Sequence, residues 1–206
     1  MPTTLRTPPD VFTRAVEALR AAPIRREISL EEMGAPTRLA PYAYALGATV
    51  LRDGEEVATG RLILLHDPAG HEAWHGTMRL VTYVTAELEP EYASDPLLPQ
   101  VGWSWLVDAL DTHTGPGRDT GYIAIAGTVT QTLSTRFGDL ARAAAEQGGD
   151  DQPGSPTAAD LEIRASWTPL GDNLGDHMQA WCTLLASTAG LPPEGVTALP
   201  TRRREN

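Results

Sequence analysis

The sequence contains no lysine, and all 16 of its basic residues are arginine. A phosphate-binding loop ending in Gly-Lys-Ser/Thr, a kinase-like strand lysine and a Schiff-base amine are therefore excluded, because each needs the lysine amine. Cysteine is nearly absent as well: Cys182 is the only one, so the chain has no disulfide framework and no paired-cysteine motif. These absences favour binding over catalysis.

The length of the chain is typical of one domain. Its 206 residues, 41% of them hydrophobic and 21% charged, suffice for one substantial core. We expect a single domain over residues 1–200. Residues 147–157 contain Gly, Asp, Pro and Ser but no large apolar side chain, which predicts a flexible insertion. The arginine-rich residues 201–206 are predicted to form a disordered tail.

The charge balance is acidic, with a formal net charge of -11 at pH 7. Such a chain repels a phosphate backbone, so nucleic acid is not an expected partner. No stretch approaches the roughly 20 apolar residues that a membrane helix needs, so no membrane partner is expected either. The lone cysteine and the lack of an apolar signal-peptide core predict a cytoplasmic protein.

The spacing of apolar residues in the first half predicts a helix followed by an antiparallel meander. Asp53-Gly54 is a strong hairpin signal, because both positions tolerate the positive φ of a type I′ turn. Asp67-Pro68-Ala69-Gly70 has the composition of a second turn. The predicted elements are a helix at 11–19 and strands at 42–51, 57–65 and 73–88, joined by turns at 53–54 and 67–70.

The second half alternates between the two kinds of element. The predicted elements are a helix at 97–113, a strand at 121–135, a short helix at 137–146, a strand at 161–167 and a helix capped by Asp172 and Asn173 that ends at Gly190. The sequence thus predicts an α+β fold, an antiparallel sheet of about five strands with helices packed on it, in the order α-β-β-β-α-β-β-α. This order resembles the type III secretion chaperone-like fold. The resemblance implies a small, acidic, dimeric protein that binds extended client segments.

Histidines gather around the second predicted turn. If residues 67–70 close that hairpin, His66 and His71 face one another at cross-strand distance. Two imidazoles and a carboxylate such as Glu72 make a zinc-type donor set. His71 and His75, however, lie four residues apart on a strand, roughly 13 Å by strand rise, which is too far for one ion. A metal site of His66, His71 and Glu72 and a group of solvated turn histidines are the two alternatives.

Trp103 and Trp105 lie two residues apart on the predicted helix, so their side chains point in different directions. We expect one of them to meet a loop, a second subunit or a client protein. The alternative is that one fills the core facing the sheet while the other packs under the proline-rich stretch 90–99. Together with Val107 they form the predicted protein-binding surface.

Two segments carry a resemblance to a known family. They are Gly102-Trp103-Ser104-Trp105-Leu106-Val107-Asp108-Ala109-Leu110, and His177-Met178-Gln179-Ala180-Trp181-Cys182 leading to Gly190-Leu191-Pro192-Pro193-Glu194-Gly195-Val196. With them, the chain resembles an actinobacterial family catalogued as domain of unknown function three thousand (DUF3000). The resemblance spans nearly everything except residues 147–157 and the tails. It implies a high-GC, Gram-positive, cytoplasmic setting and assigns no catalytic or binding residue.

Two function classes follow from these observations. The leading hypothesis is a non-enzymatic, chaperone-like protein without a cofactor that binds a protein partner or forms a homodimer. The alternative is a small-ligand or metal-binding protein, including a hydrolase, that uses the histidine cluster at the rim of the sheet. Metal analysis of untagged protein discriminates between the two.

Overall fold

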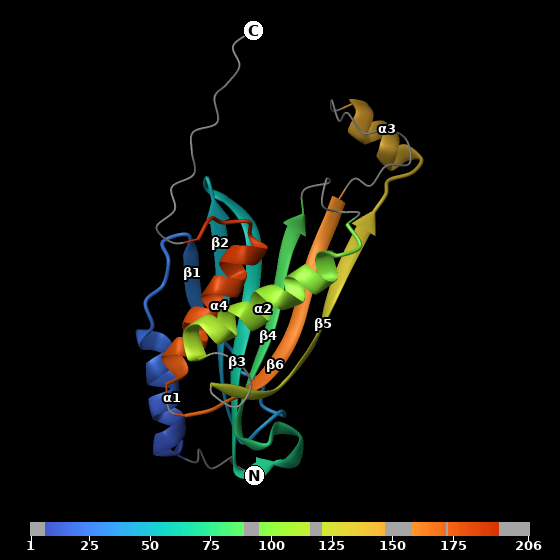
Figure 1. Cartoon of the computed structure of the whole chain (residues 1–206). Helices are drawn as coiled ribbons and strands as arrows, with labels where there is room; N and C mark the ends of the chain where they lie inside the picture. Colours follow the sequence, from blue (N-terminus) through green and yellow to red (C-terminus); the bar gives the residue numbers. More distant parts are fainter. Residues whose placement is uncertain (1–6, 89–94, 116–120, 147–157, 172, 194–206) are drawn as a thin grey trace.

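A computed structural model describes residues 7–88, 95–115, 121–146, 158–171 and 173–193, and shows a mixed α+β architecture (Figure 1). Its elements are α1 (Asp10–Ala21), β1 (Ile28–Met33), β2 (Tyr42–Arg52), β3 (Glu55–His71), the 3-10 turn η1 (Glu72–Trp74), β4 (Gly76–Leu88), α2 (Leu98–Thr114), β5 (Tyr122–Ser134), α3 (Asp139–Glu146), β6 (Ala158–Pro169) and α4 (Leu174–Thr188). The predicted insertion at 147–157 and tail at 201–206 lie outside the described residues.

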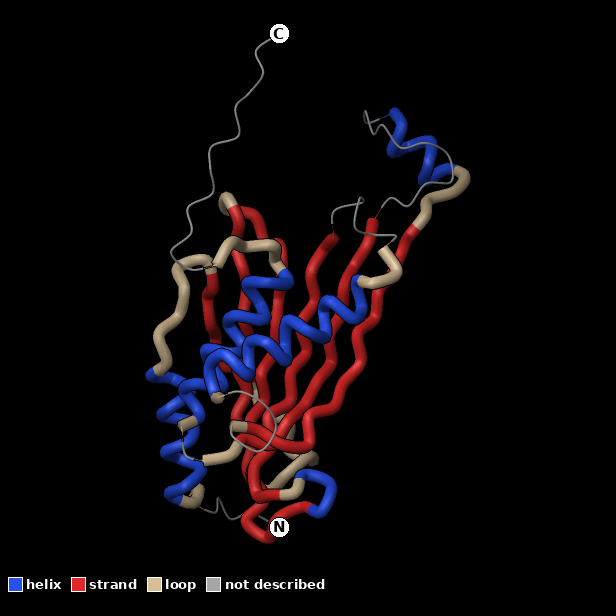
Figure 2. Tube along the Cα trace, in the orientation of Figure 1, coloured by secondary structure: helices blue, strands red, loops and turns tan. Residues whose placement is uncertain are grey.

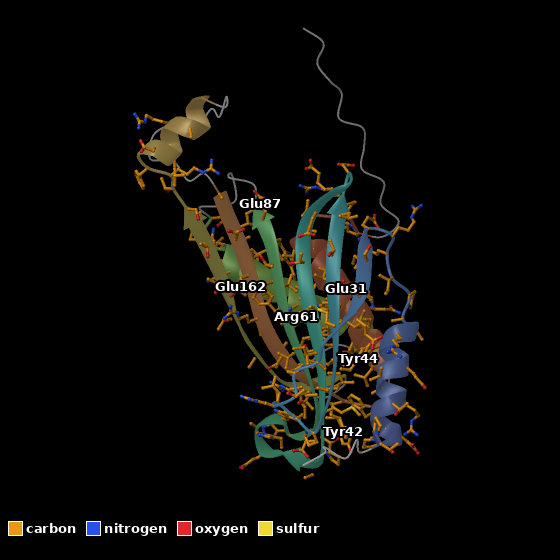
Figure 3. The ribbon with its side chains drawn as sticks, turned by 180° about the vertical axis from the view of Figure 1, so that it is seen from behind. Glu31, Tyr42, Tyr44, Arg61, Glu87 and Glu162 are labelled. Carbon is orange, nitrogen blue, oxygen red and sulfur yellow. The ribbon has the colours of Figure 1, made fainter. Side chains whose placement is uncertain are left out.

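The strands form one antiparallel sheet in the order β1-β2-β3-β4-β6-β5. Helices α2 and α4 lie across one face of this sheet, with α1 beside α4 (Figures 1 and 2). We call the opposite face the open face, because no described helix covers it (Figure 3). The α+β prediction is confirmed.

Alternation along the strands builds the core on the helix-covered face, as the sequence pattern predicted. Every second residue of β2, β4 and β6 is buried there, because neighbouring residues of a strand point to opposite faces. The buried residues of this set include Tyr44, Leu46, Ala48, Val50, Leu80, Val84, Ala86, Leu161, Ile163, Ala165 and Trp167. Helix α4 lies so deep that Met178, Trp181 and Leu185 are fully enclosed.

The sheet has six strands rather than about five. The additional strand is β1, a segment that the sequence pattern leaves as a polar stretch because glutamates occupy positions 31 and 32. Ile28 and Leu30 contact the core on the helix-covered side. Glu32 shares that side, where Arg20 of α1 pairs with it at 2.6 Å and also donates to the Tyr44 hydroxyl at 3.0 Å. The preceding helix thus accommodates the charge.

The first predicted hairpin is confirmed, and the second is displaced. Asp53 and Gly54 have φ values of 56° and 88°, as a type I′ turn requires. Residues 67–70 do not close the second hairpin, because β3 continues through them to His71 with an irregular register after His66. The Asp67 side chain accepts a hydrogen bond from the Ala69 amide, so the turn-like residues form a local kink inside the strand. The chain reverses over residues 72–75, where His75 is left-handed with φ 56°.

Helix α3 differs from the other helices. It projects away from the sheet (Figure 1), and Phe137 and Leu140 around its start are 72% and 70% exposed. None of the described helices is both long enough and apolar enough to cross a membrane.

Candidate functional site

The three residues of the predicted protein-binding surface are only half exposed. Trp103, Trp105 and Val107 all have intermediate exposure, and both tryptophans pack against the core. The ring of Trp103 reaches β5, with its Cζ3 atom 2.8 Å from the place that a Cβ on Gly127 would occupy. Glycine at this position is what lets the indole approach the strand so closely. Trp103 therefore helps to seat β5 against the rest of the fold.

The histidine cluster is divided between two environments. His66 is 2% exposed, its Nδ1 lies 3.0 Å from the Thr77 carbonyl oxygen, and its ring packs against those of Phe12 and Tyr42. His71 and Glu72 are exposed beyond the irregular end of β3, and the His71 ring stacks on Trp74. Among the described residues, no group of three or more His, Cys, Asp and Glu side chains is placed to hold a metal ion.

Residues 71–75 spell His-Glu-Ala-Trp-His, which matches the pattern His-Glu-x-x-His. Interpreting this segment only as a histidine-rich turn overlooks that match. The pattern binds zinc when it lies on a helix, where the two histidines share a face one turn apart. Here only residues 72–74 are helical, as a single 3-10 turn, while His71 is extended and His75 is left-handed. The motif lacks the helical context that its chemistry requires.

A hollow on the helix side brings Cys182 near His113. It measures about 510 Å³ and is lined by residues of α4, the end of α2 and the segments 23–25 and 191–193. The His113 Nε2 atom lies 2.8 Å from the Thr183 hydroxyl oxygen, within hydrogen-bond distance. Cys182 is 4% exposed. This arrangement resembles a packed core cysteine more than an activated nucleophile.

The open face of the sheet has the most organised arrangement of exposed side chains. Residues directly opposite one another in an antiparallel sheet share a face, so the strand register groups side chains into rows across all six strands. One row, here called the arginine row, consists of Glu31, Gly47, Arg61, Tyr83, Arg164 and Thr128. The adjacent apolar row consists of Met33, Ala45, Ile63, Val81, Ser166 and Ala126.

Tyr83 is the centre of the arginine row, with Arg61 on one side and Arg164 on the other. The Arg164 guanidinium lies over the Tyr83 ring, 5.4 Å from its centroid, and pairs with Glu162 at 2.8 Å. The Tyr83 hydroxyl donates to Glu162 at 2.8 Å, and this hydrogen bond raises the pKa of the phenol. Arg61, in contrast, forms no ion pair with any described side chain. Figure 3 shows it in the middle of the open face.

Between these two rows the face is hollowed. The hollow measures about 500 Å³ and is lined by Arg61, Ile63, Val81, Tyr83, Arg164 and residues 126–128 of β5. Ala126 and Gly127 are small, so the wall of the hollow formed by β5 is shallow. The floor is apolar and two of the surrounding groups are cationic, which suits an apolar segment that also carries a carboxylate.

A further arginine, Arg79, lies on the open face near the start of β4. Arg79 is 7% exposed and donates to the Thr168 hydroxyl at 3.1 Å and to the Ser166 hydroxyl at 2.8 Å. No described carboxylate pairs with it, and burial lowers the pKa of its guanidinium. Its hydrogen bonds to neutral oxygens of Thr168 and Ser166 connect β4 to β6.

Comparison with known proteins agrees with the family resemblance. A family model described as "Protein of unknown function (DUF3000)" matches residues 8–197. No curated protein and no solved structure matches the chain.

Proposed function

The chain belongs to the DUF3000 family, and we propose that it acts as a protein-binding module that holds an extended segment of a partner protein on the open face of its sheet. The proposal rests on one observation, that the arginine row and the apolar row lie side by side. An exposed arginine row lies next to an apolar row, on a face that no described helix covers. An antiparallel sheet commonly leaves one face in solvent, and apolar surface gathered on such a face is typical of an interaction site.

The apolar row supplies the contact area. Ile63 and Val81 are half-buried, and Tyr83 is 37% exposed. A partner that covers them removes apolar surface from water, which contributes about 25 cal/mol for each Å² buried. Tyr83 adds a rigid aromatic anchor, a residue type enriched where binding energy concentrates.

The arginine row supplies the specificity. The chain as a whole carries a net charge of -11, yet Arg61 and Arg164 are placed together around the hollow. The Arg61 guanidinium forms no ion pair with any described side chain, so a partner carboxylate gains a charge-assisted hydrogen bond there. We therefore infer a partner segment that combines apolar and acidic side chains. The resemblance of the predicted order of elements to the type III secretion chaperone-like fold agrees with such a role, and the single cysteine supports a cytoplasmic partner.

The test is photo-cross-linking in the cells that produce the protein, with a photo-reactive phenylalanine analogue in place of Tyr83. We expect a specific cross-linked protein whose attached segment, identified by mass spectrometry, contains apolar and acidic residues. Arg61→Glu should abolish the cross-link, because it places a like charge opposite the partner's carboxylate. Arg14→Glu, the same change at an exposed site on α1, should leave it intact. The absence of any cross-link at position 83, or equal cross-linking in both charge variants, contradicts the proposal.

A further inference from the structure

The two edges of the sheet differ sharply in charge. An exposed edge presents unpaired backbone N–H and C=O groups, and proteins protect such edges by keeping them short or charged. Strand β1 at one edge has six residues, two of which are glutamates. Strand β5 at the other edge has 13 residues, YIAIAGTVTQTLS, and none is charged or proline. Strand β5 is thus long and uncharged, in a chain of which 21% of residues are charged, and no described strand covers its outer side.

The middle of β5 is both accessible and held in place. Ala126, Gly127 and Thr128 are exposed, and no described strand pairs with the outer side of β5. On the helix-covered side of the sheet, α2 supports the strand, because Trp103 packs at Gly127 and Val129 packs at Gly102. An edge that is already ordered loses little conformational entropy when another strand adds to it.

We propose that β5 of one copy pairs antiparallel with β5 of a second copy and joins the two sheets into one. A second copy is the occupant because the uncharged residues of β5 match one another when the strand pairs with itself. The net charge of -11 makes two chains repel, and this repulsion is weakest along an edge that carries no charge. The edge is also self-complementary, because a twofold axis through the strand pairs it with itself.

The sequence of β5 selects one register, with Val129 opposite Val129 of the second copy. This register places Thr128 opposite Thr130 on the open face, and Ile125 opposite Leu133 on the helix side. Cross-strand threonine pairs and apolar pairs are both stabilising. Leu133 is 48% exposed in the single chain, and the Ile125 side chain of the second copy covers it in this arrangement.

This pairing has a consequence for binding. A twofold axis perpendicular to a continuous sheet keeps the two open faces on the same side of the dimer. Two equivalent faces then act together, and a partner with two binding segments gains avidity. The inference does not rest on that use of the open face, since β5 can pair whether or not a partner binds there.

The test measures molecular mass by size exclusion with light scattering over a concentration series. We expect the wild-type protein to show twice the 22.1 kDa of one chain. Thr130→Lys should give the mass of one chain, because it adds a charge to the exposed edge, whereas Thr13→Lys on exposed α1 should remain a dimer. A wild-type protein with the mass of one chain at every concentration, or a dimer that persists in Thr130→Lys, overturns the proposal.

Cross-linking tests the register independently. In a Cys182→Ala background, Val129→Cys should form a disulfide-linked dimer on oxidation, because directly opposite Cβ atoms lie about 4.5–5.5 Å apart. Leu133→Cys is the matched control: two copies of position 133 would be separated by eight residues of strand, roughly 26 Å, and should not react. Equal cross-linking at the two positions contradicts the Val129 register.

Discussion

The buried imidazole of His177 makes the stability of this protein depend on pH. His177 lies on α4 with 1% exposure, and its Nδ1 atom accepts a hydrogen bond from the Trp167 indole at 3.2 Å. Burial lowers the pKa of His177 to about 4, against the opposing effect of a hydrogen bond with the Gly121 backbone. The folded protein therefore holds this histidine neutral, since the Trp167 N–H needs an unprotonated acceptor.

The sign and size of the effect follow from linkage. The unfolded chain binds a proton at His177 with a pKa of about 6.5, whereas the folded chain resists protonation until about pH 4. Stability is therefore complete above the unfolded pKa and is lost as pH falls toward the folded one. A shift of this size corresponds to about 3 kcal/mol in total, of which about 2 kcal/mol is lost between about pH 7 and about pH 5.

Urea unfolding followed by tryptophan fluorescence measures this loss, with His177→Gln as the matched variant. Glutamine retains an amide oxygen and an amide N–H but does not titrate. The free energy of unfolding of the wild type should fall by about 2 kcal/mol more than that of the variant over the interval from about pH 7 to about pH 5. The denaturant slope should stay constant, so that the change reflects stability alone. An equal fall in both proteins would refute the assignment of a neutral, buried His177.

Two further predictions concern packing and buried charge. Gly127→Ala should lower the free energy of unfolding by about 1–3 kcal/mol, because its Cβ would lie 2.4 Å from the Arg164 carbonyl oxygen. Gly102→Ala should leave the stability unchanged or raise it by up to about 1 kcal/mol, since the added Cβ meets only ordinary van der Waals contacts on a helix. Thermal melts compare the two variants, and equal losses of stability would contradict the close approach of Gly127, on β5, to its neighbours. Thr168→Val should destabilise by about 1–3 kcal/mol, because it removes an acceptor of the buried Arg79 guanidinium. In urea unfolding, Arg79→Met should lower the free energy of unfolding less than Thr168→Val does, since it removes the buried charge together with the need for hydrogen-bond acceptors. The reverse order would show that the charge itself stabilises the fold.

Features that depend on local chemistry could be predicted from the sequence. Alternation fixed which residues of β2, β4 and β6 enter the core, because a strand can bury only every second side chain against one layer of helices. Asp53 and Gly54 determined the first hairpin through their tolerance of positive φ. The motif residues of α2 and α4 were sufficient to indicate the family.

The candidate site could not be predicted in the same way. The sequence left two alternatives for Trp103, an interface residue or a core residue, and the structure packs one side of its ring at Gly127, a residue of another element, while leaving it partly exposed. The sequence shows that a tryptophan is present, but it does not show that a glycine on β5 leaves room for the indole ring. The histidines at 66 and 71 are close in the sequence, but the irregular end of β3 places one in the core and the other in solvent.

Tertiary structure alone decided the open face and the edges of the sheet. Glu31, Arg61, Arg164 and Thr128 belong to one row only because the strand order β1-β2-β3-β4-β6-β5 and its register align them. Likewise, β1 is a strand because it pairs with β2 along its length and places Ile28 and Leu30 against the core. Pairing between strands is a long-range choice made by the whole core, whereas periodicity and turn geometry are properties of a few neighbouring residues.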